Sequence, residues 1–402
     1  MNIDVKNKRV LTRVDFNVPL NNRFEITDDT RIRSALPTIE YILKNNGSLI
    51  LMSHLGRPQK KLKPDGSLDK EKFTLEHLVD HLSNLLNRRV KFAGETTGKE
   101  TERLARELQP GEVLLLENTR FHPGETSGSD DFAKELAGLA DVYINDAFGS
   151  AHRAHASTTT VSKYFPKGAR SFGFLMESEI EHANRVLHNP KRPLVAVIGG
   201  AKVSDKILLL EKLFDLADKI IIGGGMAYTF IRAQGGRTGA SLVEEDRVEL
   251  ASQLLRKAKE KNVQILLPED SVVADAFSPE ASRKTVPSEM IENGWMGLDI
   301  GPRAQEAFRK ALLGAKTILW NGPMGVFEMA PFAGGTEAVG KSVAEATTKG
   351  AFSLVGGGDS VAAINKLKLE DQVSYVSTGG GAMLEYLEGK SLPGIAAILD
   401  DD

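Results

Sequence analysis

Short apolar runs alternate with amphipathic segments along the whole chain. Some runs, such as Val113–Leu116, are apolar at every position, which is typical of a strand buried on both faces of a parallel sheet. The strands predicted in the first half are Arg9–Phe16, Ser48–Met52, Arg89–Phe92, Glu112–Leu116 and Asp141–Ile144. Those predicted in the second half are Leu194–Ile198, Lys219–Ile222, Gln264–Leu267, Thr317–Trp320, Phe352–Val355 and Val373–Val376.

Helical periodicity fills the intervals between these runs, for example over Thr74–Leu86, Asp205–Leu216 and Glu244–Lys261. Strands that alternate with helices predict an α/β fold with parallel sheets. A chain of 402 residues is also too long for one ordinary core. We therefore expect two doubly wound parallel-sheet domains joined by a hinge helix.

The boundary between the domains is expected within residues 176–192. Glu177–Leu187 has the pattern of a charged helix, and Pro190 and Pro193 end it before the next strand. The expected domains are residues 1–175 and 193–390. An ordinary helix inside one large domain is the alternative on pattern alone.

Composition excludes several classes of protein. The net charge of −3 gives no general attraction to nucleic acid or to an anionic membrane, so an anion site has to be built locally. No cysteine is present, so disulfides, thiolate metal sites and a cysteine nucleophile are excluded. No apolar stretch predicts a signal peptide or a membrane span. We expect a cytoplasmic protein and, since no segment has the pattern of an interface, a monomer.

Cationic side chains follow the predicted strands of the first half. Because ligands bind beyond the carboxyl ends of parallel strands, these side chains are expected to meet at one edge of the sheet. Guanidinium groups match phosphate and carboxylate, so the cluster predicts a site for a small, multiply anionic molecule. Asp15 and Asn17 would offer acceptors to a hydroxyl of that molecule. The cations are Arg31, His54, Arg57, Arg120, His152 and Arg153.

Glycine-rich turns follow the strands of the second half, where backbone N–H groups and helix dipoles can face phosphates. Lys202 and Lys206, four residues apart, add positive charge and complete the prediction of a nucleotide polyphosphate site. Asp359 is expected in the first turn of a helix, either as a helix cap or as a Mg²⁺ ligand beside the phosphates. The turns begin at Gly199, Gly223, Asn321, Gly356 and Thr378.

Neither a Gly-x-x-x-x-Gly-Lys-Ser/Thr loop nor a Gly-x-Gly-x-x-Gly turn after the first strand is present. Two alternatives remain on the residues alone. One is a nicotinamide-dependent oxidoreductase, and the other is a non-catalytic protein with two anion sites.

Six long motifs resemble the phosphoglycerate kinase family, in the family's order and over essentially the whole chain. They are Arg13–Pro19, Ser53–Pro58, Asp146–Arg153, Gly199–Lys206, Trp320–Glu328 and Ser377–Ala382. The resemblance implies a reversible transfer of a phosphoryl group between 1,3-bisphosphoglycerate and ADP in glycolysis and gluconeogenesis, with Mg²⁺ as part of the nucleotide complex. It also implies that Ser391–Asp402 packs back on the first domain.

The resemblance also implies a role for particular residues. Asp15, Asn17, Arg31, His54, Leu55, Gly56, Arg57, Arg120 and Arg153 would hold 3-phosphoglycerate. Lys202, Lys206, Gly357, Gly358, Asp359 and Ser360 would hold the nucleotide phosphates and the metal, with Asp359 as the metal ligand. Gly224, Gly297, Leu298, Pro323 and Val326 would surround the adenosine, with Glu328 toward the ribose.

One departure is visible, because the family commonly has threonine where this chain has Ser360. Serine keeps the hydroxyl, so we expect a small kinetic effect.

No general base is expected for this reaction, since its nucleophile is already an anion. Arg31 and Lys202 are the expected catalytic cations, and the N–H groups of Gly358 and Gly381 are the expected fixed dipoles. Transfer is expected to follow closure of the hinge, which would keep water from the acyl phosphate.

Overall fold

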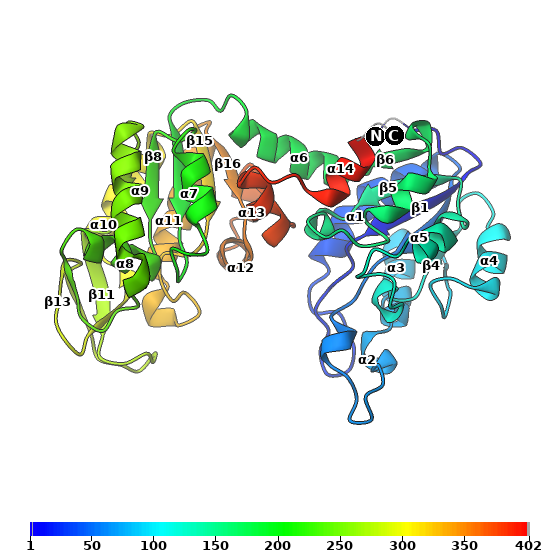
Figure 1. Ribbon diagram of the computed structural model, residues 1–402, viewed down its shortest axis with the longest axis horizontal. Coiled ribbons are helices and arrows are strands. Elements are labelled where there is room, and N and C mark those ends of the chain that lie inside the picture. The colour runs from blue at the N-terminus through cyan, green and yellow to red at the C-terminus, as the bar shows by residue number, and fades with distance from the viewer. Residues whose placement is uncertain (2, 400–402) are drawn as a thin grey trace. The chain divides into compact units, whose positions relative to one another are not determined.

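The computed structural model describes residue 1 and residues 3–399, and the chain divides into two compact units. Unit 1 comprises Met1–Ile180 and the segment that begins at Ser391. Unit 2 comprises Glu181–Lys390. The division falls inside helix α6 (Phe174–Leu187), so this helix contributes residues to both units (Figure 1).

Unit 1 is built on a parallel sheet with the strand order β3-β4-β2-β1-β5-β6. The strands are β1 (Arg9–Val14), β2 (Ser48–Met52), β3 (Val90–Phe92), β4 (Val113–Leu115), β5 (Val142–Asp146) and β6 (Arg170–Phe172). The helices between them are α1 (Thr30–Lys44), α2 (Lys70–Phe73), α3 (Val79–Leu86), α4 (Lys99–Arg106) and α5 (Asp130–Ala137). Short 3₁₀ turns include η3 (Thr119–Phe121) and η4 (Phe148–Ser150).

The sheet of unit 1 is covered on both faces. Successive residues of a strand point to opposite faces, and Val10 belongs to one apolar cluster while Leu11 belongs to the other. Leu49 and Ile50 of β2 divide in the same way. This explains why the strands are apolar at consecutive positions.

The last described segment packs on unit 1. Helix α14 (Pro393–Leu399) places Ile398 in the apolar cluster that contains Leu11. Gly394 donates its N–H to the Ala151 carbonyl at 2.8 Å and accepts from Nδ2 of Asn145 at 3.1 Å.

Unit 2 has a second parallel sheet, with the strand order β10-β8-β7-β15-β16-β17. The strands are β7 (Leu194–Ile198), β8 (Lys219–Ile222), β10 (Gln264–Leu266), β15 (Thr317–Asn321), β16 (Phe352–Val355) and β17 (Tyr375–Val376). The helices are α7 (Ile207–Leu213), α8 (Met226–Ala233), α9 (Val248–Glu260), α10 (Pro302–Leu313), α11 (Gly334–Thr348), α12 (Gly358–Lys366) and α13 (Gly381–Leu387). The strand order reverses between β7 and β15, and ligands bind at such a switch point in open α/β sheets.

Two smaller sheets complete unit 2. An antiparallel sheet joins β12 (Arg283–Pro287), β11 (Asp270–Ala274) and β14 (Met296–Ile300), and a parallel pair joins β9 (Arg237–Thr238) to β13 (Met290–Ile291). Neither was predicted, because these strands lack continuous apolar runs. In β12 exposed and half-buried residues alternate, so the strand has no apolar signal.

The predicted α/β class with two parallel sheets is confirmed, and every predicted strand is present with its ends shifted by at most a few residues. Strand β6 was missed. The helix predicted from Asp205 begins instead at Ile207, and the one predicted from Thr74 begins with a 3₁₀ turn, Leu75–Leu78. Among the described residues, none of the helices combines the length and the apolar character needed to cross a bilayer.

Candidate active site

Two neighbouring cavities lie in unit 2 at the carboxyl ends of β7 and β15. One measures about 620 Å³ and is mainly apolar, and the other measures about 390 Å³ and is lined by glycines and lysines. Gly200, Ala201, Pro323 and Asp359 line both of them, so the two cavities adjoin. Such a combination suits a ligand with an aromatic ring at one end and several negative charges at the other.

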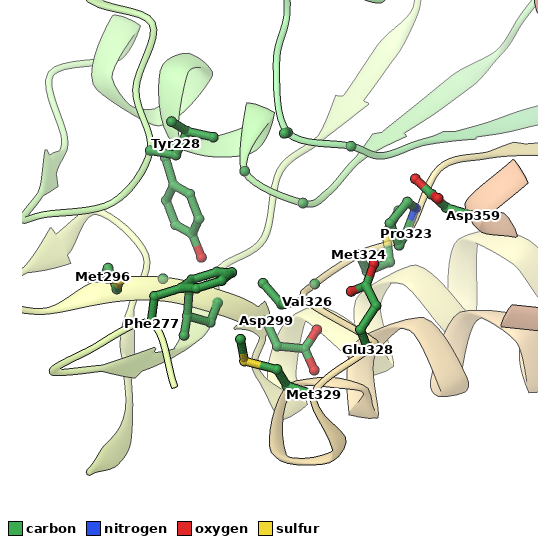
Figure 2. Close-up of a pocket in the computed structure, with 18 of the residues that line it drawn as sticks. Tyr228, Phe277, Met296, Asp299, Pro323, Met324, Val326, Glu328, Met329 and Asp359 are labelled. Carbon is green, nitrogen blue, oxygen red and sulfur yellow. The ribbon is translucent and has the colours of Figure 1, made fainter. Parts of the chain in front are cut away.

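The apolar cavity suits the ring. Tyr228, Phe277 and Met296 lie on one side of it, and the carboxylate of Asp359 lies on the other, beyond Pro323 (Figure 2). Phe277 is 62% exposed, which is unusual for a large apolar side chain that lines a cavity. Of the adenosine residues named above, Gly224, Gly297, Leu298, Pro323, Val326 and Glu328 all line this cavity.

Glycine is required where the exits of β7 and β15 meet. A Cβ on Gly199 would lie 2.0 Å from the Pro323 carbonyl oxygen. Gly322 has φ +102°, and a Cβ there would lie 2.1 Å from the Gly199 oxygen. The two turns therefore touch through their backbones, and together they form the floor of the charged cavity.

The charged cavity contains both predicted lysines. Lys206 donates to Oδ1 of Asn321, which in turn donates Nδ2–H to the Gly356 carbonyl at 3.0 Å. Burial lowers the pKa of Lys206, against the opposing effect of Asp205 and other nearby carboxylates. Lys202 is exposed and makes no hydrogen bond or ion pair with the described residues, so its charge is available to a ligand.

Lys202 and Lys206 both lie before helix α7, so their spacing of four residues is not one turn of a helix. Residues 199–206 form a turn, and α7 begins only at Ile207, after Lys206. The hydroxyl and N–H of Ser204 bind the Glu244 carboxylate at 2.6 and 3.1 Å, which holds this turn. The positive charge of Lys202 therefore lies before the helix and not within its first turn.

Helix α12 begins at the charged cavity. Asp359 lies in its first turn, as predicted, but makes no capping hydrogen bond and has no ion-pair partner in the part of the chain that the structure describes. A Cβ added to Gly358 or Gly381 would meet no protein atom within 4 Å, so packing does not explain glycine at these positions. A ligand that approaches the backbone closely does explain it.

Ser360 differs from its neighbours because it does not line either cavity. It is fully buried, and its hydroxyl accepts from the Gly322 N–H at 2.6 Å. The side chain therefore joins the start of α12 to the turn after β15.

The predicted cations of unit 1 gather at the carboxyl end of the sheet. Burial lowers the pKa of His54 well below its usual value, and the charges of Arg13, Arg120 and Arg31 lower it further. Burial also lowers the pKa of Arg120 to about 10, helped by the charges of Arg13 and Arg57. The mutual repulsion of these cations indicates a site that favours an anion.

The remaining predicted cations belong to the segment after η4. The positive charge of Arg153 is one of the effects that lower the pKa of His155 to about 4, although burial is the largest. His152 directly precedes Arg153 and is half-buried. Arg57 and Arg153 are exposed, and Arg31 and Arg120 are half-buried.

Hydrogen bonds from side chains of the cationic cluster and its neighbours stabilise the loop after β2. Oδ1 of Asn17 accepts from the Gly56 N–H at 2.8 Å, and Arg120 donates to the Gly56 carbonyl at 2.6 Å. Asn17 therefore offers a ligand its Nδ2 donor and the second lone pair of Oδ1. Asp15 accepts from Arg31 at 3.3 Å, while Leu55 is buried and contributes to the core.

Two buried residues of unit 1 were missed from the sequence. Arg13 is fully buried, and Nη2 of its side chain donates to Nδ1 of His54 at 3.0 Å. Its signal was a charged side chain next to Val14 inside the predicted strand Arg9–Phe16, where burial leaves no solvent. Glu125, also fully buried, binds Ser157 and Thr119, and nothing in the sequence around it indicated this position.

Comparison with known proteins agrees with this geometry. A family model described as phosphoglycerate kinase matches residues 1–390. The chain is 52% identical over 398 residues to a protein of Nicotiana tabacum named cytosolic phosphoglycerate kinase, with 99% of this chain and 96% of the relative covered. It is 52% identical over 398 residues to the phosphoglycerate kinase of Moorella thermoacetica, covering 99% and 98%.

A solved structure is also similar. The phosphoglycerate kinase of Coxiella burnetii has a TM-score of 0.87 and 42% identity, with 99% of this chain and 97% of that chain covered.

Proposed function

Because the chain belongs to the phosphoglycerate kinase family, we propose that its two sites divide the two substrates of that family between them. The chain is a phosphotransferase that moves a phosphoryl group between 1,3-bisphosphoglycerate and ADP. Unit 1 (the proposed domain 1–175 with 391–402) binds 3-phosphoglycerate, and unit 2 (the proposed domain 193–390) binds the nucleotide. Residues 176–192 serve as the hinge helix.

One observation supports the nucleotide assignment above the others. The apolar cavity and the lysine-lined cavity adjoin at the point where the strand order of unit 2 reverses. Adenosine fits the first cavity, and the phosphates fit the second beside Lys202, Lys206 and the start of α12. Neither the nicotinamide-dependent alternative nor the non-catalytic one is supported by the family.

The cationic cluster suits 3-phosphoglycerate, which carries one phosphate and one carboxylate. Arg31, Arg57 and Arg120 would bind these groups by charge-assisted hydrogen bonds. Asp15 would accept from the hydroxyl, and Nδ2 of Asn17 would donate to an anionic oxygen. Such a site selects a small molecule with two anionic ends.

Asp359 fits a single carboxylate ligand to Mg²⁺. The described residues contain no group of three or more histidine and acidic side chains that could hold a metal alone. Mg²⁺ needs none, because it takes one or two carboxylates together with substrate phosphate oxygens. When bound with the nucleotide, Mg²⁺ would supply positive charge to the phosphate oxygens.

The residues of the two sites would then act by position and charge. The nucleophile is a phosphate oxygen of ADP, or the carboxylate in reverse, so no residue has to remove a proton. Lys202 and Arg31 would stabilise the negative charge that spreads over the transferring group, and the N–H groups of Gly358 and Gly381 would add fixed dipoles. Closure of the hinge would bring the substrates into line and keep water from the acyl phosphate.

We also propose that the protein is a cytoplasmic monomer. Relatives from Nicotiana tabacum and Arabidopsis thaliana are named cytosolic, which supports the location. Sedimentation at several protein concentrations would test this state. A monomer should show the same molecular mass at every concentration.

A coupled assay with 3-phosphoglycerate, ATP and Mg²⁺ tests the proposal. We expect turnover that disappears when the metal is chelated and returns when it is restored. Small-angle scattering should also show that both substrates together reduce the radius of gyration more than either alone. Folded protein that binds ATP but gives no turnover would contradict the assignment of catalysis to these sites.

A further inference from the structure

The guanidinium group of Arg13 forms its hydrogen bonds with other protein atoms. The side chain is fully buried on β1, and Nε donates to the Ser157 hydroxyl at 2.8 Å. Nη1 donates to the Val14 carbonyl, and Nη2 contacts Nδ1 of His54 at 3.0 Å. Both ends of the fork are therefore engaged by protein atoms, and the contact with His54 connects Arg13 to the anion site.

This contact determines which nitrogen of His54 carries the proton. A guanidinium group has donors only, so the Nδ1 atom that faces it has to be an acceptor without a hydrogen. A neutral imidazole with no proton on Nδ1 carries its proton on Nε2. The described residues supply no hydrogen-bond partner for Nε2 of His54, so that N–H is available to a ligand.

We infer that Arg13 is a positioning residue that holds His54 as the neutral Nε2–H tautomer, so that His54 gives the bound acid a hydrogen bond and no charge. The inference rests on the proposed role of His54 in binding 3-phosphoglycerate. It assigns a different task to each group of the site. The exposed and half-buried arginines supply charge, and His54 supplies one directed donor.

Burial and four neighbouring basic side chains oppose the protonation of His54. Arg13 on β1, Arg31 on α1, Arg120 on η3 and His155 after η4 all disfavour a positive charge on the ring. Burial has the largest effect and acts in the same direction, and together they lower the pKa of His54 well below its usual value. These effects favour the neutral ring that the contact with Arg13 also requires.

Arg13 is itself held by a buried carboxylate, through Ser157. The Ser157 hydroxyl accepts from Arg13 and donates to Oε1 of Glu125 at 2.6 Å. Oε2 of Glu125 accepts the Ser157 N–H at 3.0 Å, and Thr119 donates to Oε1 at 3.2 Å. Glu125 is fully buried, so it balances the charge of Arg13 in a region without solvent.

Nitrogen-15 NMR of the histidine rings tests the inference on the intact protein. We expect one ring, assigned by its loss in His54→Gln, to show a protonated Nε2 and an unprotonated Nδ1 from about pH 8 to about pH 5.5. A ring of His54 that titrates near its usual pKa, or that carries its proton on Nδ1, would overturn the inference. This measurement needs no substrate, so it does not depend on the proposed function.

Variants test the consequence for binding. Arg13→Met removes the donors, so His54 should show a mixed tautomer and the KM for 3-phosphoglycerate should rise about tenfold or more, with a smaller change in kcat. Arg13→Lys keeps one donor and should recover part of the loss. Ser157→Ala keeps Arg13 and should have a smaller effect. Loss of kcat without any change in the tautomer would contradict the positioning role.

Two substitutions of His54 separate this inference from the proposed function. Gln can place an N–H near the position of Nε2, whereas Asn places its amide near Nδ1, so His54→Gln should keep a lower KM for 3-phosphoglycerate than His54→Asn. If neither substitution changes the KM, His54 does not bind the substrate and the proposed function of this residue fails. The tautomer seen by NMR would still stand in that case.

Discussion

At the scale of single residues, the two sites differ in how their charged groups are supported. In unit 1, Arg13 and His54 are buried, and each has protein partners. In unit 2, Lys202 and Asp359 line the charged cavity without an ion-pair partner among the described residues. Their charges are therefore balanced only when a ligand is bound, so these two side chains should respond most strongly to substitution.

Lys202→Ala should lower kcat about 10²- to 10³-fold, since Lys202 is proposed to stabilise charge that develops in the transition state. The KM for ATP should rise much less, because Lys206 and the start of α12 remain. Steady-state kinetics in the coupled assay measures both constants. Lys310→Ala is the matched control, since Lys310 is an exposed lysine of unit 2 that lines neither cavity. An unchanged kcat in Lys202→Ala would remove this residue from the transition state.

At the scale of elements, the nucleotide cavities depend on the contact between the turns that follow β7 and β15. Gly199 and Gly322 approach each other's backbones so closely that neither turn has space for a side chain. Ser360 adds a hydrogen bond from the first turn of α12 to the Gly322 N–H. Three elements that are distant in the sequence are thus held together by the contact between the two turns and by the Ser360 hydroxyl.

Gly199→Ala should therefore separate these turns. The added Cβ would lie 2.0 Å from the Pro323 carbonyl oxygen, and a backbone atom cannot move away as a flexible side chain can. We expect a loss of about 1–3 kcal/mol in the free energy of unfolding and weaker binding of ATP. Denaturant unfolding and calorimetric titration measure the two effects.

Gly168→Ala is the control for this substitution, because a Cβ at Gly168 would meet no atom within 4 Å. It should change neither stability nor ATP binding. Equal behaviour of the two variants would show that the contact between the turns is not important.

At the scale of the whole molecule, each unit has its own parallel sheet and its own apolar core. Each also has a buried carboxyl group whose pKa burial raises to about 7, Asp146 in unit 1 and Asp299 in unit 2. Two units with separate cores are not expected to unfold in one transition. The tryptophans, Trp295 and Trp320, both lie in unit 2, so their fluorescence reports the unfolding of that unit.

The stability of unit 2 should depend on pH through Asp299. Its pKa is about 7 in the folded state and about 3.9 in the unfolded state, so between these values the folded state holds the additional proton. The free energy of unfolding should therefore fall as the pH rises from about 4 to about 7 and should then level off. One proton corresponds to a slope of up to about 1.4 kcal/mol per pH unit.

Asp299→Asn should remove this part of the pH dependence. Asp299 accepts the N–H groups of Ile300 and Gly335 at 2.8 and 2.7 Å, and Asn keeps only one acceptor, so the variant should be less stable by about 1–3 kcal/mol. Urea unfolding followed by tryptophan fluorescence at several pH values measures both effects. Identical slopes for the two proteins would show that Asp299 does not titrate in this range.

The alternation of apolar runs and amphipathic segments was sufficient to predict both parallel sheets, because a strand buried on two faces has to be apolar at consecutive positions. The residues at the carboxyl ends of the strands could also be predicted, since arginines and glycines follow the strands directly in the sequence. The small sheets of unit 2 were not predicted, because strands such as β12 are polar and partly exposed. Likewise, the start of α7 after Lys206 was not predicted. The turn before this helix is stabilised by the hydrogen bond from Ser204 to Glu244, and these residues are 40 positions apart in the sequence.

Only the tertiary structure decided which donors, acceptors and charges of each polar side chain are available to a ligand. Arg13 and Arg120 are both arginines near strand ends, yet one is fully buried against His54 and the other remains half-exposed. Ser360 and Asp359 are adjacent, yet one is joined to Gly322 and the other faces the cavities. Sequence spacing determines which residues reach the same edge of a sheet, but hydrogen-bond partners and burial depend on contacts between distant segments.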